Sequence, residues 1–346
     1  MRQFPNRRTI LAAGLLAFGA DALGAGSATA QAAPVPVRIG VIPVIGAAPI
    51  FVANGEGWLE AAGLKPGFTT FESGPNMIQA LASGTIDVYV AGIAPLAVAR
   101  TKNIDVRVVA ATAVEEMVFV AGPKLAPYFA ATADKAEAFR RYREKEGRAA
   151  RLATQPPGSV PNTTLQHWLW QVAKTDKTNA EVVAMGIDAT QQALLAGAVD
   201  GASIREPALT IVQQRNPAIA LIATGAEMFP DQPGTVVAVS GAFADRNPAA
   251  VQGLVDALVK ATDLLKTDPA RAAPPVEKAL GKGITDLATI RKALSSPAAK
   301  FTADPRVIVE ATRKMQAYQV SIGTLDKDVP IDGLFVPGFY EKAIAR

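Results

Sequence analysis

One phrase occurs in both halves of this chain. The stretch "QALASGTIDVYVAGIAP" runs from Gln79 to Pro95, and "QALLAGAVDGASIREPA" runs from Gln192 to Ala208. Each copy contains the end of a helix, a glycine suited to close it, an aspartate at the turn and the start of a strand. A unit that recurs at the same place in two successive series of elements predicts two similar α/β lobes.

Strand and helix patterns alternate around both copies, with short loops. Apolar β-rich runs indicate strands, and apolar residues at helical spacing indicate helices. This alternation favours, in each lobe, a mostly parallel sheet flanked by helices. The first series predicts strands near 37–44, 65–73 and 86–92 and helices near 50–63 and 74–84. The second predicts strands near 149–155, 180–186 and 199–204 and helices near 163–175 and 188–197, with Asp188 as N-cap of the last.

Two further strands, 117–122 and 234–241, are expected to carry the chain from one lobe to the other and back. The second lobe is then an insertion of residues 122–234 into a first lobe of residues 31–121 and 235–346. Residues 242–346 have mostly helical patterns and are expected to form a helical C-terminal tail. Both crossings are short, which suits a hinge.

The first thirty residues have the three-part layout of an export signal. A basic start is followed by an apolar run and then by small residues that end in an Ala-x-Ala site at Ala30. Arg7 and Arg8 make the segment resemble a twin-arginine signal. The apolar run is too short to span a bilayer. We therefore expect removal of residues 1–30 near Ala30-Gln31 and a periplasmic mature protein.

The composition excludes several kinds of chemistry. There is no cysteine, so thiol catalysis, disulfides and cysteine metal sites are excluded. The single histidine, His167, lies in a helical pattern and is expected on a helix face. No metal site and no cofactor are expected. The net charge of +4 is too small and too dispersed for a nucleic-acid partner.

Five motifs, taken in order, resemble those of substrate-binding proteins of ABC importers, in the nitrate, sulfonate and taurine group. They are "FVANGEGWLEAAGLKPGF", "SGPNMIQALASGTIDVYVAGIAP", "LATQPPGSVPNTTLQHWL", "ALLAGAVDGASIREP" and "DGLFVPGFYEKA". The resemblance implies the two-lobed type II periplasmic-binding-protein fold, with a ligand cleft between the lobes. It implies a monomer that delivers a small, anionic organic solute to a permease in the inner membrane. One departure is Arg205, which stands where the group usually has an aromatic residue.

Ligands of open parallel sheets bind beyond the carboxyl ends of the strands, where helix N-termini attract anions. Arg205 there favours a carboxylate or sulfonate by bidentate geometry, and Glu206 either receives an amine or fixes Arg205. The serines and asparagines of these loops either contact the ligand or cap helices. The candidate ligand-binding residues are Gly46, Ala47, Ala48, Ser73, Gly74, Asn76, Ile93, Ala94, Gly158, Ser159, Asn162, Arg205 and Glu206.

Two alternatives stay open at this point. One is a ligand sensor that reports to a membrane partner other than a transporter. The other is an enzyme on the same fold that acts on a pyrimidine-like substrate. Glu115 and Glu116 are an adjacent acid pair, but neighbours in an extended segment point to opposite faces, which makes them poor partners for acid–base work. We expect no catalytic residues.

Overall fold

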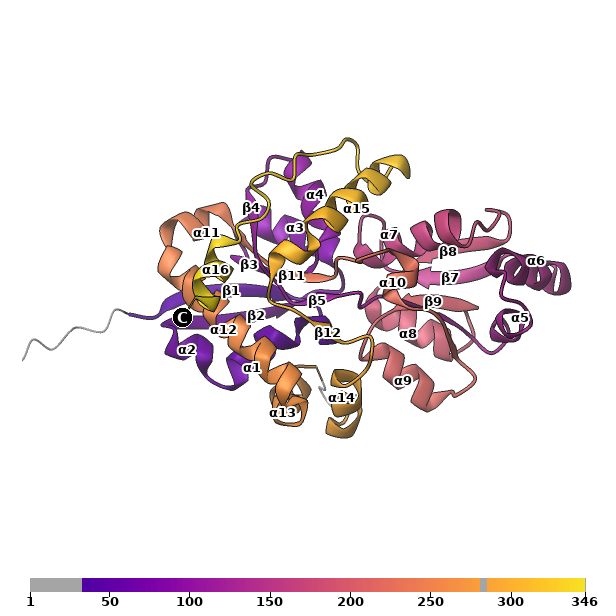
Figure 1. Cartoon of the computed structure of the whole chain (residues 1–346), viewed down its shortest axis with the longest axis horizontal. Coiled ribbons are helices and arrows are strands. Elements are labelled where there is room, and N and C mark those ends of the chain that lie inside the picture. Colours follow the sequence, from indigo (N-terminus) through magenta and orange to yellow (C-terminus); the bar gives the residue numbers. More distant parts are fainter. Residues whose placement is uncertain (1–32, 281–284, 346) are drawn as a thin grey trace, which may run out of the picture. The chain divides into compact units, whose positions relative to one another are not determined.

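The computed structural model describes residues 33–280 and 285–345. The expected export signal, with Arg7 and Arg8, lies outside the described residues. From Pro34 onward the chain forms one compact unit, and within it two five-stranded sheets can be followed in Figure 1.

The first sheet has the strand order β2-β1-β3-β11-β4. β1 pairs in parallel with β2 and β3, whereas β11 is antiparallel to β3 and β4. The strands are β1 (Val35–Val41), β2 (Leu64–Thr70), β3 (Val88–Gly92), β4 (Val106–Ala111) and β11 (Thr235–Ser240).

The second sheet repeats this arrangement with the order β10-β6-β9-β7-β8. β7 pairs in parallel with β8 and β9, and β6 is antiparallel to β9 and β10. The strands are β6 (Val118–Ala121), β7 (Ala150–Thr154), β8 (Ala180–Ala184), β9 (Gly201–Ile204) and β10 (Ala220–Ala223). β5 (Ala113–Val114) and β12 (Lys300–Phe301) form a separate antiparallel pair.

Each sheet is therefore mixed, and apart from one strand its strands run the same way, as the predicted mostly parallel sheet requires. Four strands of each sheet run the same way, and one reversed strand, β11 or β6, is inserted between them. These are the strands expected to cross between lobes. β6 belongs to the second sheet, so that sheet starts at Val118, four residues before the expected boundary at residue 122.

Helices cover the sheets, and their positions can be followed in Figure 1. The bounds in the first half of the chain are η1 (Ile45–Ala47), α1 (Ala48–Gly55), α2 (Trp58–Ala61), α3 (Gly74–Ala82), α4 (Ala94–Thr101), α5 (Ala126–Ala130), α6 (Lys135–Glu146), α7 (Val160–His167) and η2 (Trp168–Val172). Those that follow are α8 (Ile187–Leu195), α9 (Ala208–Arg215), α10 (Gly225–Met228), α11 (Gly241–Arg246), α12 (Pro248–Thr267), α13 (Pro269–Leu280), α14 (Leu287–Leu294), η3 (Pro305–Ile308), α15 (Val309–Ser321) and α16 (Gly338–Ile344).

The two copies of the repeated phrase fold alike. α3 and α8 both end just before a glycine in the left-handed region, Gly84 at φ 70° and Gly197 at φ 68°. Glycine reaches this conformation without steric cost, which closes each helix where the phrase predicts. β3 and β9 then follow.

Two expectations for helix ends are wrong. The helix expected over 50–63 is divided into α1 and α2, because Gly57 adopts a φ of 73° between them. Asp188 is not the N-cap of α8. That position belongs to Gly186, and Asp188 lies within the first turn.

Each sheet is buried between layers of helices. Side chains of the first sheet pack against α1, α3, α4 and α12 in one large cluster. In the second sheet successive side chains point to opposite faces, and each face has its own cluster of buried apolar residues. Phe119 faces α6 and η2 through Phe139 and Trp168, while Val118 and Val120 face α8 and α9.

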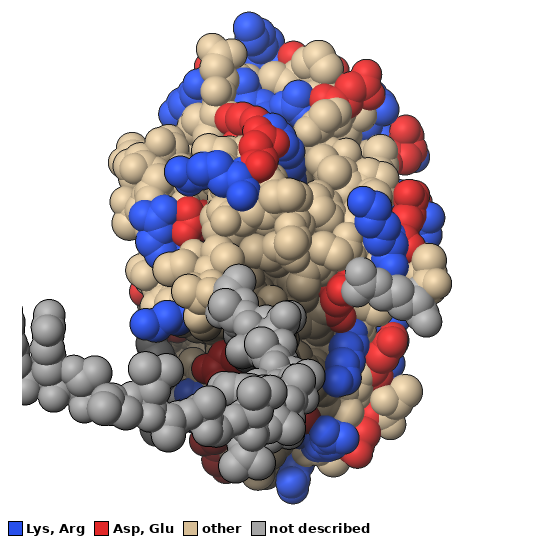
Figure 2. Space-filling view, turned by 90° about the vertical axis from the view of Figure 1, so that its left-hand side faces the viewer, with Lys and Arg blue, Asp and Glu red and all other residues tan. Residues whose placement is uncertain are grey.

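The surface shown in Figure 2 carries basic and acidic side chains interspersed among uncharged ones. Among the residues described, no helix is both long and apolar enough to cross a membrane.

Candidate functional site

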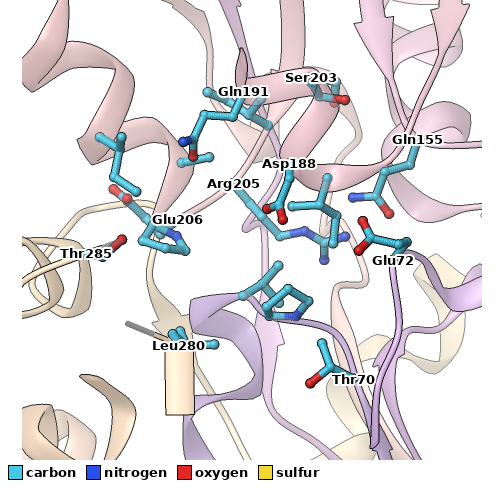
Figure 3. Close-up of a pocket in the computed structure, with 18 of the residues that line it drawn as sticks. Thr70, Glu72, Gln155, Asp188, Gln191, Ser203, Arg205, Glu206, Leu280 and Thr285 are labelled. Carbon is cyan, nitrogen blue, oxygen red and sulfur yellow. The ribbon is translucent and has the colours of Figure 1, made fainter. Parts of the chain in front are cut away.

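A cavity of about 160 Å³ is lined by loops from both sheets. The first sheet contributes residues around the carboxyl ends of β1 and β2, and the second contributes those that follow β7, β8 and β9. Part of α13 completes the wall. The polar and charged side chains that line the cavity are Thr70, Glu72, Gln155, Asp188, Thr190, Gln191, Ser203, Arg205, Glu206 and Thr285 (Figure 3).

Arg205 lines the cavity as expected, but its charge already has a partner. Its Nη1 donates to Glu116 Oε1 at 2.8 Å, and the two side chains are only 4% and 3% exposed. Thr235 Oγ1 donates to the same carboxylate oxygen at 2.6 Å. Glu116 follows β5, and Thr235 begins β11. The pair thus joins the loop after β9 to the segments that connect the two sheets.

Gly46 makes room for this ion pair. A Cβ built on Gly46 would lie 2.1 Å from Glu116 Oε2 and 2.7 Å from Thr235 Oγ1. Any side chain at this position would therefore collide with the buried carboxylate. Gly46 was expected to let backbone approach a ligand, and the structure shows it approaching Glu116.

Glu206 also lines the cavity, and its carboxylate bonds the first turn of α9. Its two carboxylate oxygens accept the Thr210 N–H and the Thr210 hydroxyl, both at 3.0 Å. Burial raises the pKa of Glu206 above its usual value, although these hydrogen bonds and the charge of Lys292 oppose the shift. The Glu206 carboxylate is therefore already engaged by the helix that follows it.

Ser159 and Asn162 organise the start of α7. Ser159 Oγ accepts the Asn162 N–H at 3.3 Å as the N-cap, and Asn162 Nδ2 donates to the Gln155 carbonyl at 3.3 Å. Gly158, at φ 81°, provides the turn before them, and its carbonyl accepts from Gln319 Nε2 at 3.4 Å. The capping role considered from sequence is therefore observed for Ser159, whereas the Asn162 side chain bonds the Gln155 carbonyl instead.

The remaining candidates lie away from the cavity lining. A Cβ on Gly74 would lie 2.5 Å from Tyr89 Oη, so this glycine serves close packing. Ser73 Oγ is buried without a hydrogen-bond partner in the described parts of the chain. Asn76 is exposed. The other four, Ala47, Ala48, Ile93 and Ala94, are buried in the core of the first sheet.

Sequence reasoning missed the polar residues that do line the cavity. Glu72 and Gln155 stand just beyond the observed ends of β2 and β7, in loops whose glycines and serines were chosen instead. Asp188 was considered only as a helix cap. These residues could have been found by the reasoning used for Arg205. Ligands bind beyond the carboxyl ends of the strands, so charged and amide side chains just after a strand are candidates for ligand contact.

A comparison with protein-family models matches residues 30–277 to the NMT1-like family. This match covers well over half of the sequence. The chain belongs to the NMT1-like family. Its curated relatives include the nitrate import ATP-binding protein NrtC of Synechococcus elongatus, which is 30% identical over 114 residues. That stretch makes up 33% of this chain and only 17% of the relative.

This NMT1-like protein has the fold of type II periplasmic binding proteins. The nitrate-binding protein NrtA of Synechocystis PCC 6803 superimposes with a TM-score of 0.73 at 12% identity, covering 90% of this chain and 89% of that one. The alkanesulfonate-binding protein SsuA of Xanthomonas axonopodis gives 0.69 at 20% identity, covering 89% and 100%. The desulfurization enzyme DSZB gives 0.61 at 13% identity, covering 90% and 99%, so the fold also hosts an enzyme.

Proposed function

We propose that this protein is the extracytoplasmic solute-binding component of an ABC importer. It captures a small organic solute in the cavity between the two sheets and presents the closed form to a permease in the inner membrane. The solute is bound and released unchanged. The expected export signal and the fold shared with NrtA and SsuA support a periplasmic location and this role.

The observation that carries the proposal is the composition of the cavity wall. Thr70 and Glu72 reach it from the first sheet, and Gln155 and Asp188 reach it from the second. A solute that contacts both sets of residues stabilises the arrangement in which they face one another. We place the two lobes on either side of the segments that contain Glu116 and Thr235, with the second lobe beginning at β6.

The test is thermal unfolding of the mature protein, from Gln31 onward, with a panel of anions, sulfonates, aromatic acids, amines and pyrimidines. A bound solute raises the melting temperature by mass action. We expect a concentration-dependent rise for one chemical class, with the solute recovered unchanged. Chemical alteration of the solute would instead support an enzyme. If no solute shifts the melting temperature and none co-purifies, the binding role is wrong.

A further inference from the structure

Two carboxylates in the cavity have no partner among the residues that the structure describes. Glu72 follows β2, and Asp188 lies in the first turn of α8, the equivalent place after β8 in the second sheet. Neither side chain forms a hydrogen bond or an ion pair with any residue that the structure describes. A Cβ built on Gly186, two residues before Asp188, would lie 3.1 Å from Glu72 Oε2. The Glu72 carboxylate therefore lies against the loop that leads to Asp188.

A buried amide without a partner points into the same space. Gln155 is 5% exposed, and its side chain forms no hydrogen bond within the described parts of the chain. In Figure 3 its amide is directed toward the region that Glu72 and Asp188 also face. Ser203 Oγ, at the wall of the cavity, is likewise buried and unpartnered. Polar groups buried in this way cost free energy unless a ligand or water satisfies them.

The charge balance of the described lining residues favours a cation. Arg205 is the one cation among them, and three carboxylates, Glu72, Asp188 and Glu206, stand against it. Arg205 is already neutralised by Glu116. Glu206 is engaged by Thr210 and faces Lys292. Among the described lining residues, the negative charge that forms no ion pair or hydrogen bond is that of Glu72 and Asp188.

The N-termini of α8 and α9, the helices that follow β8 and β9, do not supply an anion site at this wall. The Glu206 carboxylate already accepts the Thr210 N–H in the first turn of α9. Asp188 places a negative charge in the first turn of α8, where an anionic ligand would otherwise approach. In α9 the protein's own carboxylate takes the place that an anion would occupy, and in α8 the charge of Asp188 repels an anion.

We infer that the solute carries a protonated amine, which binds between Glu72 and Asp188 and donates to Gln155. This inference rests on the proposed binding role and names the class of solute. An ammonium group held by carboxylates from both sheets forms charge-assisted hydrogen bonds and favours closure. The cavity volume of about 160 Å³ suits a small molecule.

The experiment uses four probes that share one carbon skeleton: n-butylamine, N-acetylbutylamine, butyrate and butane-1-sulfonate. Thermal unfolding and calorimetric titration of the mature protein measure each probe. Variants Glu72→Gln and Asp188→Asn remove one charge each with little change in shape. Glu310→Gln, which loses only an exposed ion pair with Arg313, is the control.

Butylamine is expected to raise the melting temperature, and the other three probes are not. Glu72→Gln and Asp188→Asn should each weaken butylamine binding about tenfold, the loss of roughly one charged hydrogen bond. Because neither carboxylate has a hydrogen-bond or ion-pair partner among the described residues, Glu72→Gln should melt, without probe, no lower than the native chain. Asp188→Asn should melt only slightly lower, since it loses the favourable interaction of an acid with the first turn of α8. Glu310→Gln should bind as the native protein does.

Tighter binding of butyrate or butane-1-sulfonate, unchanged by Glu72→Gln, would overturn the amine inference and leave the binding role standing. Absence of any shift with all four probes would also overturn it. The binding role would fail as well only if the broad panel of solutes gave no shift and no solute co-purified.

Discussion

Asp87 binds Arg38 through both backbone and side chain. Its Oδ2 accepts the Arg38 N–H at 3.0 Å and Nε at 2.8 Å, and the Asp87 N–H donates to the Arg38 carbonyl at 2.8 Å. Asp200 repeats this in the second sheet. It accepts the Arg151 N–H at 2.8 Å, and its own N–H donates to the Arg151 carbonyl at 2.8 Å. Both pairs are separated by 49 residues. The aspartate of the repeated phrase thus ties the incoming strand to its parallel neighbour in each sheet.

Replacement of either aspartate by asparagine is expected to destabilise the fold. Each variant loses a charged acceptor that is largely buried, so the free energy of unfolding should fall by about 1–3 kcal/mol. Urea unfolding measures the change. Asp245→Asn, which removes an exposed partner of Arg107, is the control and should change stability by less than about 0.5 kcal/mol. Equal effects at Asp87 and Asp245 would contradict the structural role.

The same aspartates are expected to make the folded protein less stable in acid. Burial acts to raise the pKa of Asp87, but its hydrogen bonds with Arg38 and the Arg38 charge outweigh burial and lower it. Burial likewise opposes the lowering of the Asp200 pKa, which Arg148, Tyr142 and Arg151 produce. A lowered folded-state pKa contributes stability that is complete above about pH 4 and is lost as pH falls through the folded value. The acid unfolding curve of Asp87→Asn should therefore be shallower below about pH 4 than that of the native protein.

Local patterns in the sequence were sufficient to predict most elements and the duplication. Gly84 and Gly197 end their helices as expected, because a left-handed C-terminus is a property of a few adjacent residues. The role of Arg205 could not be predicted in this way. Its partner Glu116 lies 89 residues earlier in the chain, and no local spacing reports such a pair. β6 and β11 were both predicted as strands, but their reversed direction was not, since strand direction is set by long-range pairing.

Removing one partner of the Arg205–Glu116 pair is expected to lower the free energy of unfolding strongly. Replacing both partners at once is expected to lower it much less. Arg205→Met leaves Glu116 buried without a counter-charge, which should lower the free energy of unfolding by about 3–5 kcal/mol. The double variant Arg205→Met/Glu116→Gln should lose clearly less than the sum of the two single variants. Urea unfolding of the four proteins measures the coupling.

The neighbouring exposed pair serves as the control for that cycle. Lys300 forms an ion pair with Glu115, and the Lys300 side chain is 51% exposed. Lys300→Ala should cost no more than about 1 kcal/mol. Additive effects of Arg205→Met and Glu116→Gln would show that the two side chains do not stabilise one another.

Gly46→Ala tests whether this glycine serves the buried carboxylate. The new methyl group would be placed 2.1 Å from Glu116 Oε2, so the carboxylate or the backbone must move. The expected cost is about 1–3 kcal/mol of unfolding free energy. Gly67→Ala, where an added Cβ meets nothing within 4 Å, is the matched control and should be nearly neutral. A neutral Gly46→Ala would mean that Glu116 moves freely.

The partly buried imidazole of His167 is expected to make the folded protein less stable in mild acid. Burial lowers its pKa, although the hydrogen bond between Nδ1 and the Met228 carbonyl, 2.8 Å long, opposes the shift. The unfolded chain therefore takes up a proton below about pH 6.5 that the folded protein resists. Stability from this group is complete above that pH and declines as pH falls toward the folded value.

His167→Gln keeps a donor for the Met228 carbonyl and removes the titration. The native protein should lose more unfolding free energy between pH 7 and pH 5 than this variant. Glu206, whose raised pKa has the opposite effect on the pH dependence, is present in both proteins and cancels in the difference. Since His167 is the one histidine of the chain, the difference isolates its contribution. Parallel pH profiles for the two proteins would show that the imidazole is as easily protonated in the folded state as in the unfolded one.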